Sequence, residues 1–351
     1  MRRLAPLLFV CLALATPSFA HNHVHVRHDK KGKKRPVPPP VATAHLAYYG
    51  GKVISNVKIV AVFWGPNVDA TVQKDIGAFY ADLVGGPAWD WLSEYNTTGV
   101  KTVTGAPSSN QTIGRGTFAK AVTITPKAKG NPLKDAQIQT ELAAQIKAGK
   151  LPAADANTLY MIHFPPKQTI SMGGLSCQAF CAYHGTMNKT TYYGVMPDQS
   201  AGSGCDVGCG HDGPFGNVTV SAAHEVTEAT TDAQVGAAGN SMGPPIAWYD
   251  PHKDATGAEY AEIGDICASY SADYKGPSGR SWKIQKEWSN KAGGCIAKQG
   301  DPPAVASASA GASSSGSHTP VDQPPGKAAK GKTGKSAVPA KSTPPRRPLA
   351  G

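Results

Sequence analysis

The hydrophobic residues of this 351-residue chain gather between about residues 45 and 300, where two spacings alternate. Val57 to Trp64 is a nearly continuous apolar run closed by Gly65-Pro66, which is typical of a strand buried on both faces. Ala70 to Val84 follows with its apolar residues at helical spacing and predicts an amphipathic helix. A buried strand followed by such a helix indicates the beginning of an α/β layer.

The same alternation continues over the next hundred residues. Thr117 to Thr125 predicts another strand, and Pro132 to Lys150 predicts a second helix with one apolar stripe. Thr158 to Phe164 is again strand-like, and we expect its His163 to be a satisfied core or edge histidine rather than a ligand. We therefore predict an α/β (α+β) fold with a mixed sheet that contains some parallel pairing. Trp89, Trp91 and Leu92 should cap the same core.

The two ends of the chain have a different composition. Met1 to Ala20 carries two arginines, an apolar run and small residues before the cleavage point, the pattern of a signal peptide. Residues 21–44 form a His-, Lys- and Pro-rich leader whose histidines could scavenge a transition metal, and residues 300–351 form an Ala-, Ser-, Pro- and Lys-rich tail. Both are expected to be disordered. We expect one domain over residues 45–299, in a periplasmic or extracellular protein without a transmembrane segment.

The charge follows the same division. The formal net charge is +11, but the two ends carry the whole excess, and residues 41–300 sum to −1. A nucleic-acid-binding domain would carry its basic patch on the fold, so nucleic acid is not expected as a partner. We expect the basic tails to hold the protein near an anionic cell-surface polymer by screened attraction, so that retention on cells falls with added salt.

Six cysteines remain after the signal peptide, an even number that is typical of disulfides in an exported protein. The two Cys-x-x-x-Cys pairs could in principle bind zinc, but thiolates outside the cell would compete with oxidation. Of the fifteen possible pairings, we expect three local bridges that staple the C-terminal half. These are Cys177 to Cys181, Cys205 to Cys209, and Cys267 to Cys295.

The main chemical signal is the segment from Ser221 to Asp232, S-A-A-H-E-V-T-E-A-T-T-D. If residues 222–229 are helical, His224 and Glu228 lie one turn apart on one face and can reach the same ion. Glu225 is offset by about a hundred degrees and is free to act as a general base. This is the H-E-x-x-H arrangement of metallopeptidases with a glutamate as second ligand, and both ligand types bind zinc. The alternative is a purely structural helix.

A catalytic zinc needs a third protein ligand besides a water molecule. We favour Asp265, then Glu262, then Asp232, with Asp250 as a further carboxylate near the site. Asp232 would lie roughly 12 Å along a straight helix from His224, so it could join only if the chain turns. The alternative for Glu262 and Asp265 is a turn held by side-chain to backbone hydrogen bonds. Candidate hydrogen-bond donors to an oxyanion are Tyr249, His252 and Tyr260.

Several segments of the second half resemble a known family. G-G-L-S-C-Q-A-F-C-A-Y-H-G over residues 173–185, Y-Y-G-V-M-P over 192–197 and G-C-D-V-G-C-G over 204–210 are similar to the exordium or phosphate-induced protein family. The segments W-Y-D at 248–250 and E-I-G-D-I-C at 262–267, after a His-Glu helix, look like bacterial secreted relatives of that family. Plant members are secreted, wall-associated proteins linked to growth, without an established catalytic activity.

Three functions compete at this point. The first is a secreted, zincin-like metallopeptidase that cleaves peptides or proteins with zinc and Glu225. The second, which the family resemblance implies, is a non-enzymatic wall or matrix protein whose carboxylates, including Asp250 and Asp265, hold a structural ion such as calcium. The third is a carbohydrate-binding module that stacks sugars on tryptophans. Its candidate tryptophans are Trp64, Trp89, Trp91 and Trp248.

Overall fold

The computed structural model describes residues 43–235, 245–253, 259–268 and 270–304, which belong to one compact unit. Its centre is a five-stranded sheet in the order β3-β2-β5-β8-β7. Four strands are parallel, and β7 at one edge is antiparallel to β8. The predicted α/β class with a mixed sheet is therefore confirmed. The strands are β2 (Lys58–Trp64), β3 (Thr117–Ile124), β5 (Thr158–His163), β7 (Tyr183–Met187) and β8 (Thr191–Met196).

The apolar run in β2 lacks alternation because both faces of the sheet are covered. Ile59, Ala61 and Phe63 belong to a core shared with α1 (Ala70–Gly85) and α4 (Gly213–Thr231). The residues between them, Val60 and Val62, belong to a second core shared with α2 (Asp135–Lys147). A strand between two cores must be apolar at every position.

The first two predicted helices correspond to α1 and α2, but α2 is shorter than the predicted segment Pro132 to Lys150 at both ends. Asp69 caps the N-terminus of α1, because its side chain accepts hydrogen bonds from the backbone N–H groups of Thr71 and Val72. α2 begins later than Pro132, because β4 (Leu133–Lys134) pairs with β6 (Ile170–Ser171) before the helix starts. A backbone engaged in a sheet cannot also form the first helical turn.

The tryptophans proposed for sugar stacking lie in the interior. Trp89 and Trp91 lie in the 3₁₀ helix η1 (Pro87–Tyr95) and join the core with Leu92, as predicted. Trp64, Trp89, Trp91 and Trp248 are 5%, 2%, 5% and 8% exposed. A sugar stacks only on an accessible ring face, so these four residues do not form a carbohydrate platform. The prediction that they do was wrong.

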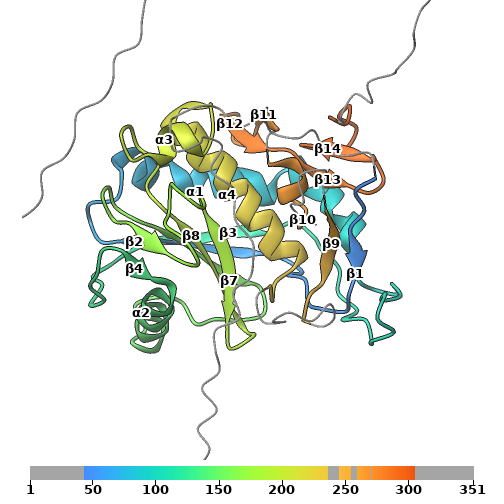
Figure 1. Ribbon diagram of the computed structural model, residues 1–351, viewed down its shortest axis with the longest axis horizontal. Coiled ribbons are helices and arrows are strands. Elements are labelled where there is room, and N and C mark those ends of the chain that lie inside the picture. The colour runs from blue at the N-terminus through green and yellow to red at the C-terminus, as the bar shows by residue number, and fades with distance from the viewer. Residues whose placement is uncertain (1–42, 236–244, 254–258, 269, 305–351) are drawn as a thin grey trace, which may run out of the picture. The chain divides into compact units, whose positions relative to one another are not determined.

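Helix α4 extends beyond the predicted residues 222–229 at both ends and contacts β7, β8 and the C-terminal strand β12 (Ser281–Gln285) (Figure 1). Pro214 lies in its first turn, where a missing N–H costs nothing. Every residue from Asn217 to Thr231 is buried. The Thr230 and Thr231 hydroxyls donate to carbonyls of the preceding turn, so the helix satisfies them itself. Charged side chains on such a helix need buried partners.

The C-terminal part consists of short antiparallel strands. A three-stranded sheet has the order β1-β9-β10, and two hairpins follow, β11–β12 and β13–β14. Backbone hydrogen bonds join Cys295 to Ala304, so the fold continues beyond the expected boundary at residue 299. The bounds are β1 (Ala47–Tyr48), β9 (Trp248–Lys253), β10 (Glu259–Ala261), η2 (Asp265–Cys267), β11 (Ser271–Lys275), β12 (Ser281–Gln285), β13 (Glu287–Ser289) and β14 (Gly294–Ile296).

The expected signal peptide lies outside the described residues. Of the expected leader only residues 43–44 are described, and of the expected tail only residues 300–304. Within the described ranges, no helix is long and apolar enough to cross a membrane.

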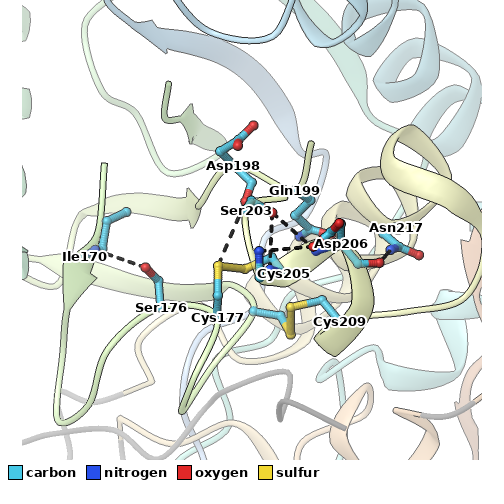
Figure 2. Close-up of a disulfide and its surroundings, with 12 residues drawn as sticks. Ile170, Ser176, Cys177, Asp198, Gln199, Ser203, Cys205, Asp206, Cys209 and Asn217 are labelled. Carbon is cyan, nitrogen blue, oxygen red and sulfur yellow. Dashed lines mark hydrogen bonds between the residues drawn. A yellow bond between two sulfur atoms is a disulfide. The ribbon is translucent and has the colours of Figure 1, made fainter. Parts of the chain in front are cut away.

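Three disulfides staple the C-terminal half, but two of the predicted pairings were wrong. Cys177 bonds to Cys205 and Cys181 to Cys209, whereas the predicted Cys267–Cys295 bridge is confirmed. Cys205 and Cys209 lie one turn apart across α3 (Cys205–Gly208), and Figure 2 shows this turn beside Cys177. Side chains four residues apart on a helical turn point the same way. Each sulfur therefore reaches the neighbouring segment rather than its near neighbour in sequence.

Tryptic digestion without reduction distinguishes the two pairings. Cleavage after Lys167, Lys189 and Lys253 yields peptides 168–189 and 190–253, each of which contains two cysteines. The observed pairing links these peptides through two disulfides, so we expect one species that reduction converts into two. Mass spectrometry of the digest measures this. Two separate peptides before reduction would instead support the local pairing.

His163 is a buried core histidine, as predicted. Its Nε2 lies 3.0 Å from the Tyr80 hydroxyl, and burial lowers its pKa to about 3. The unfolded chain takes up a proton near the ordinary pKa of 6.5, whereas the folded chain resists protonation down to about 3. Stability is therefore lost as the pH falls through this window, and His163 should lower the free energy of unfolding by about 1.4 kcal/mol per pH unit.

Urea unfolding of the parent and of His163→Gln between about pH 7 and pH 5 tests this linkage. Glutamine keeps a polar group near the Tyr80 hydroxyl but cannot titrate. The variant should therefore lose about 2 kcal/mol less stability than the parent over this range. Equal losses in the two proteins would show that His163 does not control the acid sensitivity.

Candidate metal centre

Three residues predicted as metal ligands converge beside α4. His224 Nε2 and Glu228 Oε1 are 3.0 Å apart on the predicted helix face. Asp265, at the start of η2, brings its Oδ1 to 3.8 Å from the same imidazole nitrogen. The Asp265 backbone N–H also donates to Glu228 Oε1 at 3.1 Å. The tertiary structure thus joins His224, Glu228 and Asp265 into one group.

A second histidine, His184 in β7, joins the centre, although the sequence did not single it out as a ligand. Its Nδ1 lies 3.3 Å from Glu225 Oε2 and 3.6 Å from Glu228 Oε2. Its Nε2 lies 3.7 Å from Glu262 Oε1. The only sequence signal was its position at the end of the family-like segment 173–185, because β7 carries no metal-ligand spacing of its own.

The converging residues form two groups that share Glu228. One contains His224, Glu228 and Asp265, and the other contains His184, Glu228 and Glu262; within each, the ligand atoms lie within 4.8 Å of one another. Ligand atoms bound to one ion at about 2.1 Å are about 3.0–3.5 Å apart. Both groups therefore have nearly the spacing that a bound cation requires.

Most polar atoms that face the centre have no hydrogen-bond partner among the described residues. Both carboxylate oxygens of Glu262 are buried without one, as are Nε2 of His184 and Nε2 of His224. His224 Nε2 and Glu228 Oε1 are close but do not form a hydrogen bond. Buried polar groups are almost always paired, and isolated ones are costly. Imidazole nitrogens and carboxylate oxygens directed at one another form groups that could hold a metal ion.

Burial also controls the charges of the surrounding acids. It raises the pKa of Glu262 and of Asp265 well above their ordinary values, and the nearby Glu228 carboxylate adds to both shifts. It likewise raises the pKa of Asp232 to about 7 and that of Glu287 to about 8. The raised pKa values favour the protonated acids, and a bound divalent ion would oppose this by favouring their ionised forms.

The neighbouring carboxylates raise the pKa values of the two imidazoles. Burial alone lowers the pKa of His184, but the hydrogen bond with Glu225 and the negative charges of Glu225 and Glu228 outweigh it and raise the pKa to about 9. Burial also lowers the pKa of His224, and the Glu228 carboxylate again reverses the shift to well above the ordinary value. When all of these acids are ionised, two imidazolium groups do not balance their charge, and a bound divalent cation would supply the difference.

Glu225 lies outside both ligand groups, as its offset on the helix predicts. Burial raises its pKa, although the His184 hydrogen bond and the His224 charge oppose the shift. Burial acts on Glu228 in the same way, but there the charges of the two histidines prevail and lower the pKa to about 2. Neighbouring carboxylates with opposite pKa shifts are the division expected between a proton-accepting base and an ionised ligand.

Residues of the C-terminal strands hold the centre in place. The Gln285 side-chain amide lies 2.9 Å from His224 Nδ1 and donates to the Gly264 carbonyl, which orients the ring with Nε2 toward Glu228. A Cβ atom on Gly264 would lie 2.5 Å from His224 Nδ1 and 2.9 Å from Glu228 Oε1. The turn before η2 can approach this closely because the residue is glycine. Gln285 was not identified from the sequence.

The remaining candidate carboxylates fall outside the two groups. Asp232 ends α4, where its Oδ1 accepts a hydrogen bond from the Ala247 N–H and its Oδ2 is buried without a partner among the described residues. It affects the centre through charge, since its carboxylate raises the pKa of Glu262. Asp250 is used elsewhere, because it accepts hydrogen bonds from the backbone N–H groups of His45 and His252.

Two of the oxyanion candidates, His252 and Tyr249, contact residues other than the ligands in the described part of the chain. The His252 side chain is 75% exposed and contacts Asp250 at 2.6 Å. Tyr249 packs in a separate apolar cluster with Tyr49 and Ile246. The side chain of Tyr260 lies outside the described residues.

Comparison of the chain with protein-family models, with curated proteins and with solved structures returned no significant match. The resemblance to the exordium family therefore stays a prediction.

Proposed function

We propose that this protein is a metal-dependent hydrolase, of the zinc metallopeptidase type, that acts outside the cytoplasm. The main support is the position of Glu225 next to the ligands His224 and Glu228 on one buried helix turn. Its Oε1 is buried without a hydrogen-bond partner among the described residues, and burial raises its pKa. A carboxylate whose pKa lies above its ordinary value is a stronger proton acceptor than an exposed one.

The residues would divide the work as follows. His224, Glu228 and Asp265 would hold the ion, which when bound polarises a carbonyl and acidifies water. Glu225 takes the proton from the attacking water and gives it to the leaving amine. His184 contacts Glu225 Oε2, which leaves Oε1 for the proton. Glu228 brings negative charge where a histidine would be neutral, which weakens a Lewis acid and makes manganese a second candidate besides zinc.

One observation supports a second function. His224, Glu225, Glu228 and Glu262 are 0% exposed, and the Asp265 side chain is 7% exposed, so the described residues shield the centre from a polypeptide. Closed sites are typical of structural metal ions. In this alternative the protein is non-enzymatic and of exordium type, and its cation, zinc or calcium, fastens α4 to the C-terminal strands.

The disulfides support the proposed location. Three bridges in one domain persist only in an oxidising compartment. Together with the predicted signal peptide they favour a secreted or periplasmic protein, and the basic tails favour retention on an anionic cell-surface polymer.

Metal analysis combined with a peptide-library assay distinguishes the two functions. Bound zinc, with cleavage that stops after chelation and returns with added zinc, would support the hydrolase. Bound metal without cleavage would support the structural alternative, particularly if chelation lowers the melting temperature. A purified protein without any bound metal, and unable to take up zinc or calcium, would contradict both.

A further inference from the structure

We propose that the centre binds two divalent cations, with the Glu228 carboxylate as the bridge between them. This deepens the proposed function, and it rests on the binding of a cation at His224 but not on hydrolysis. The second cation would occupy the group formed by His184, Glu228 and Glu262.

The two oxygens of Glu228 face different partners. Oε1 lies 3.0 Å from His224 Nε2 and accepts the Asp265 N–H, whereas Oε2 lies 3.6 Å from His184 Nδ1. Oε2 has no hydrogen-bond partner among the described residues. A carboxylate that offers one oxygen to each of two ions holds them about 3.5–4 Å apart, the separation found in two-metal sites.

A single ion would leave Glu262 unexplained. An ion in the first group would contact His224, Glu228 and Asp265. Glu262 is not a member of that group. Glu262 would then remain a fully buried carboxylate with neither oxygen paired among the described residues. Its Oε1 lies 3.7 Å from Nε2 of the His184 imidazole. A second ion between Glu262 and His184 satisfies both, as well as the free oxygen of Glu228.

The charges agree with two ions. Four carboxylates face the two groups directly: Glu225, Glu228, Glu262 and Asp265. Two divalent cations balance these four charges when the imidazoles bind as neutral ligands, whereas one cation balances only half of them. Each group supplies one imidazole and two carboxylates, which suits zinc or manganese better than calcium, because calcium prefers oxygen ligands alone.

Counting zinc ions on the full chain tests the proposal. Native mass spectrometry after equilibration with zinc alone should show two ions per chain. The histidines of the leader could bind zinc independently, so the measurement uses the full chain with His21, His23, His25 and His28 replaced by serine. Manganese provides a second measurement, because two bridged Mn²⁺ ions give an exchange-coupled paramagnetic resonance spectrum and separate ions do not.

Substitutions assign the two ions. Glu262→Gln should retain one zinc, bound through His224 and Asp265, and Asp265→Asn should retain the other. Glu94→Gln is the control, because the Glu94 carboxylate accepts hydrogen bonds from the Ser289 hydroxyl and the Lys291 backbone N–H. This variant should retain two zinc ions. One ion in the parent, or two ions in Glu262→Gln, would overturn the bridged pair and leave the hydrolase proposal intact. No ion in the parent would contradict both. If a variant does not fold, the parent count and the manganese spectrum still decide.

Discussion

Replacement of Glu225 by glutamine is expected to lower the rate of peptide hydrolysis by about 10²–10⁴-fold, the usual contribution of a general base. Glutamine has nearly the same shape but cannot take a proton from water. Glu225 is outside both ligand groups, so the variant should keep its bound metal. The effect should therefore appear in the turnover rate, while metal content and fold are unchanged. Initial rates on a cleaved library peptide, with metal analysis of the same samples, measure it.

Glu94→Gln is the matched control for this variant, because it removes a carboxylate at η1, away from the centre, and should leave hydrolysis unchanged. Equal rates for the parent and Glu225→Gln would exclude Glu225 as the base. Loss of metal together with activity in Glu225→Gln would instead make Glu225 a ligand and require a different assignment of the helix face.

Substitution of alanine for Gly264 is expected to weaken zinc binding by at least about 10–100-fold, the loss typical when support around metal ligands is removed. The residue has φ −83° and ψ −38°, a conformation that alanine adopts without strain. The added Cβ, however, would overlap the imidazole of His224 at 2.5 and 2.8 Å and meet Glu228 Oε1 at 2.9 Å. Either the turn moves away, and Asp265 with it, or the imidazole rotates out of position.

Gly85→Ala is the matched control. It is the last residue of α1, and the nearest atom to an added Cβ would be 3.9 Å away. Zinc titration calorimetry and thermal unfolding, with and without zinc, should show parent behaviour for Gly85→Ala. For Gly264→Ala they should show little stabilisation by zinc. Parent affinity in Gly264→Ala would show that the ion binds away from His224 and Glu228.

The spacing of residues within α4 was enough to predict which of them share a face of the helix. The H-E-x-x-E spacing placed His224 and Glu228 on one face and Glu225 off it, and the structure has the same arrangement. Asp265, favoured as the third ligand, lies in one group with His224 and Glu228, and its role as a ligand stays a prediction. The rise of the helix predicted that Asp232 would join only if the chain turned; it lies at the end of α4 and accepts a hydrogen bond from Ala247 rather than joining a ligand group.

Other members of the centre could not be found in this way. His184 reaches Glu225 across 41 positions of sequence, and Gln285 reaches His224 across 61. Each lies on a strand, and the alternation of apolar and polar residues along a strand indicates only which of its faces is buried. The disulfides give the same lesson, because Cys177 and Cys181 bond across 28 positions to two cysteines with identical local spacing.

The sequence by itself determined the buried strands, the amphipathic helices and the helix face that carries the first two ligands. These features depend on residues within about one helical turn or one strand, and side-chain periodicity records them. Only the tertiary structure decided that β7 and the turn before η2 close on that face, that Glu228 lies between two histidines, and which cysteines pair. Those contacts depend on how separate elements pack, and the spacing within one element does not specify the position of another.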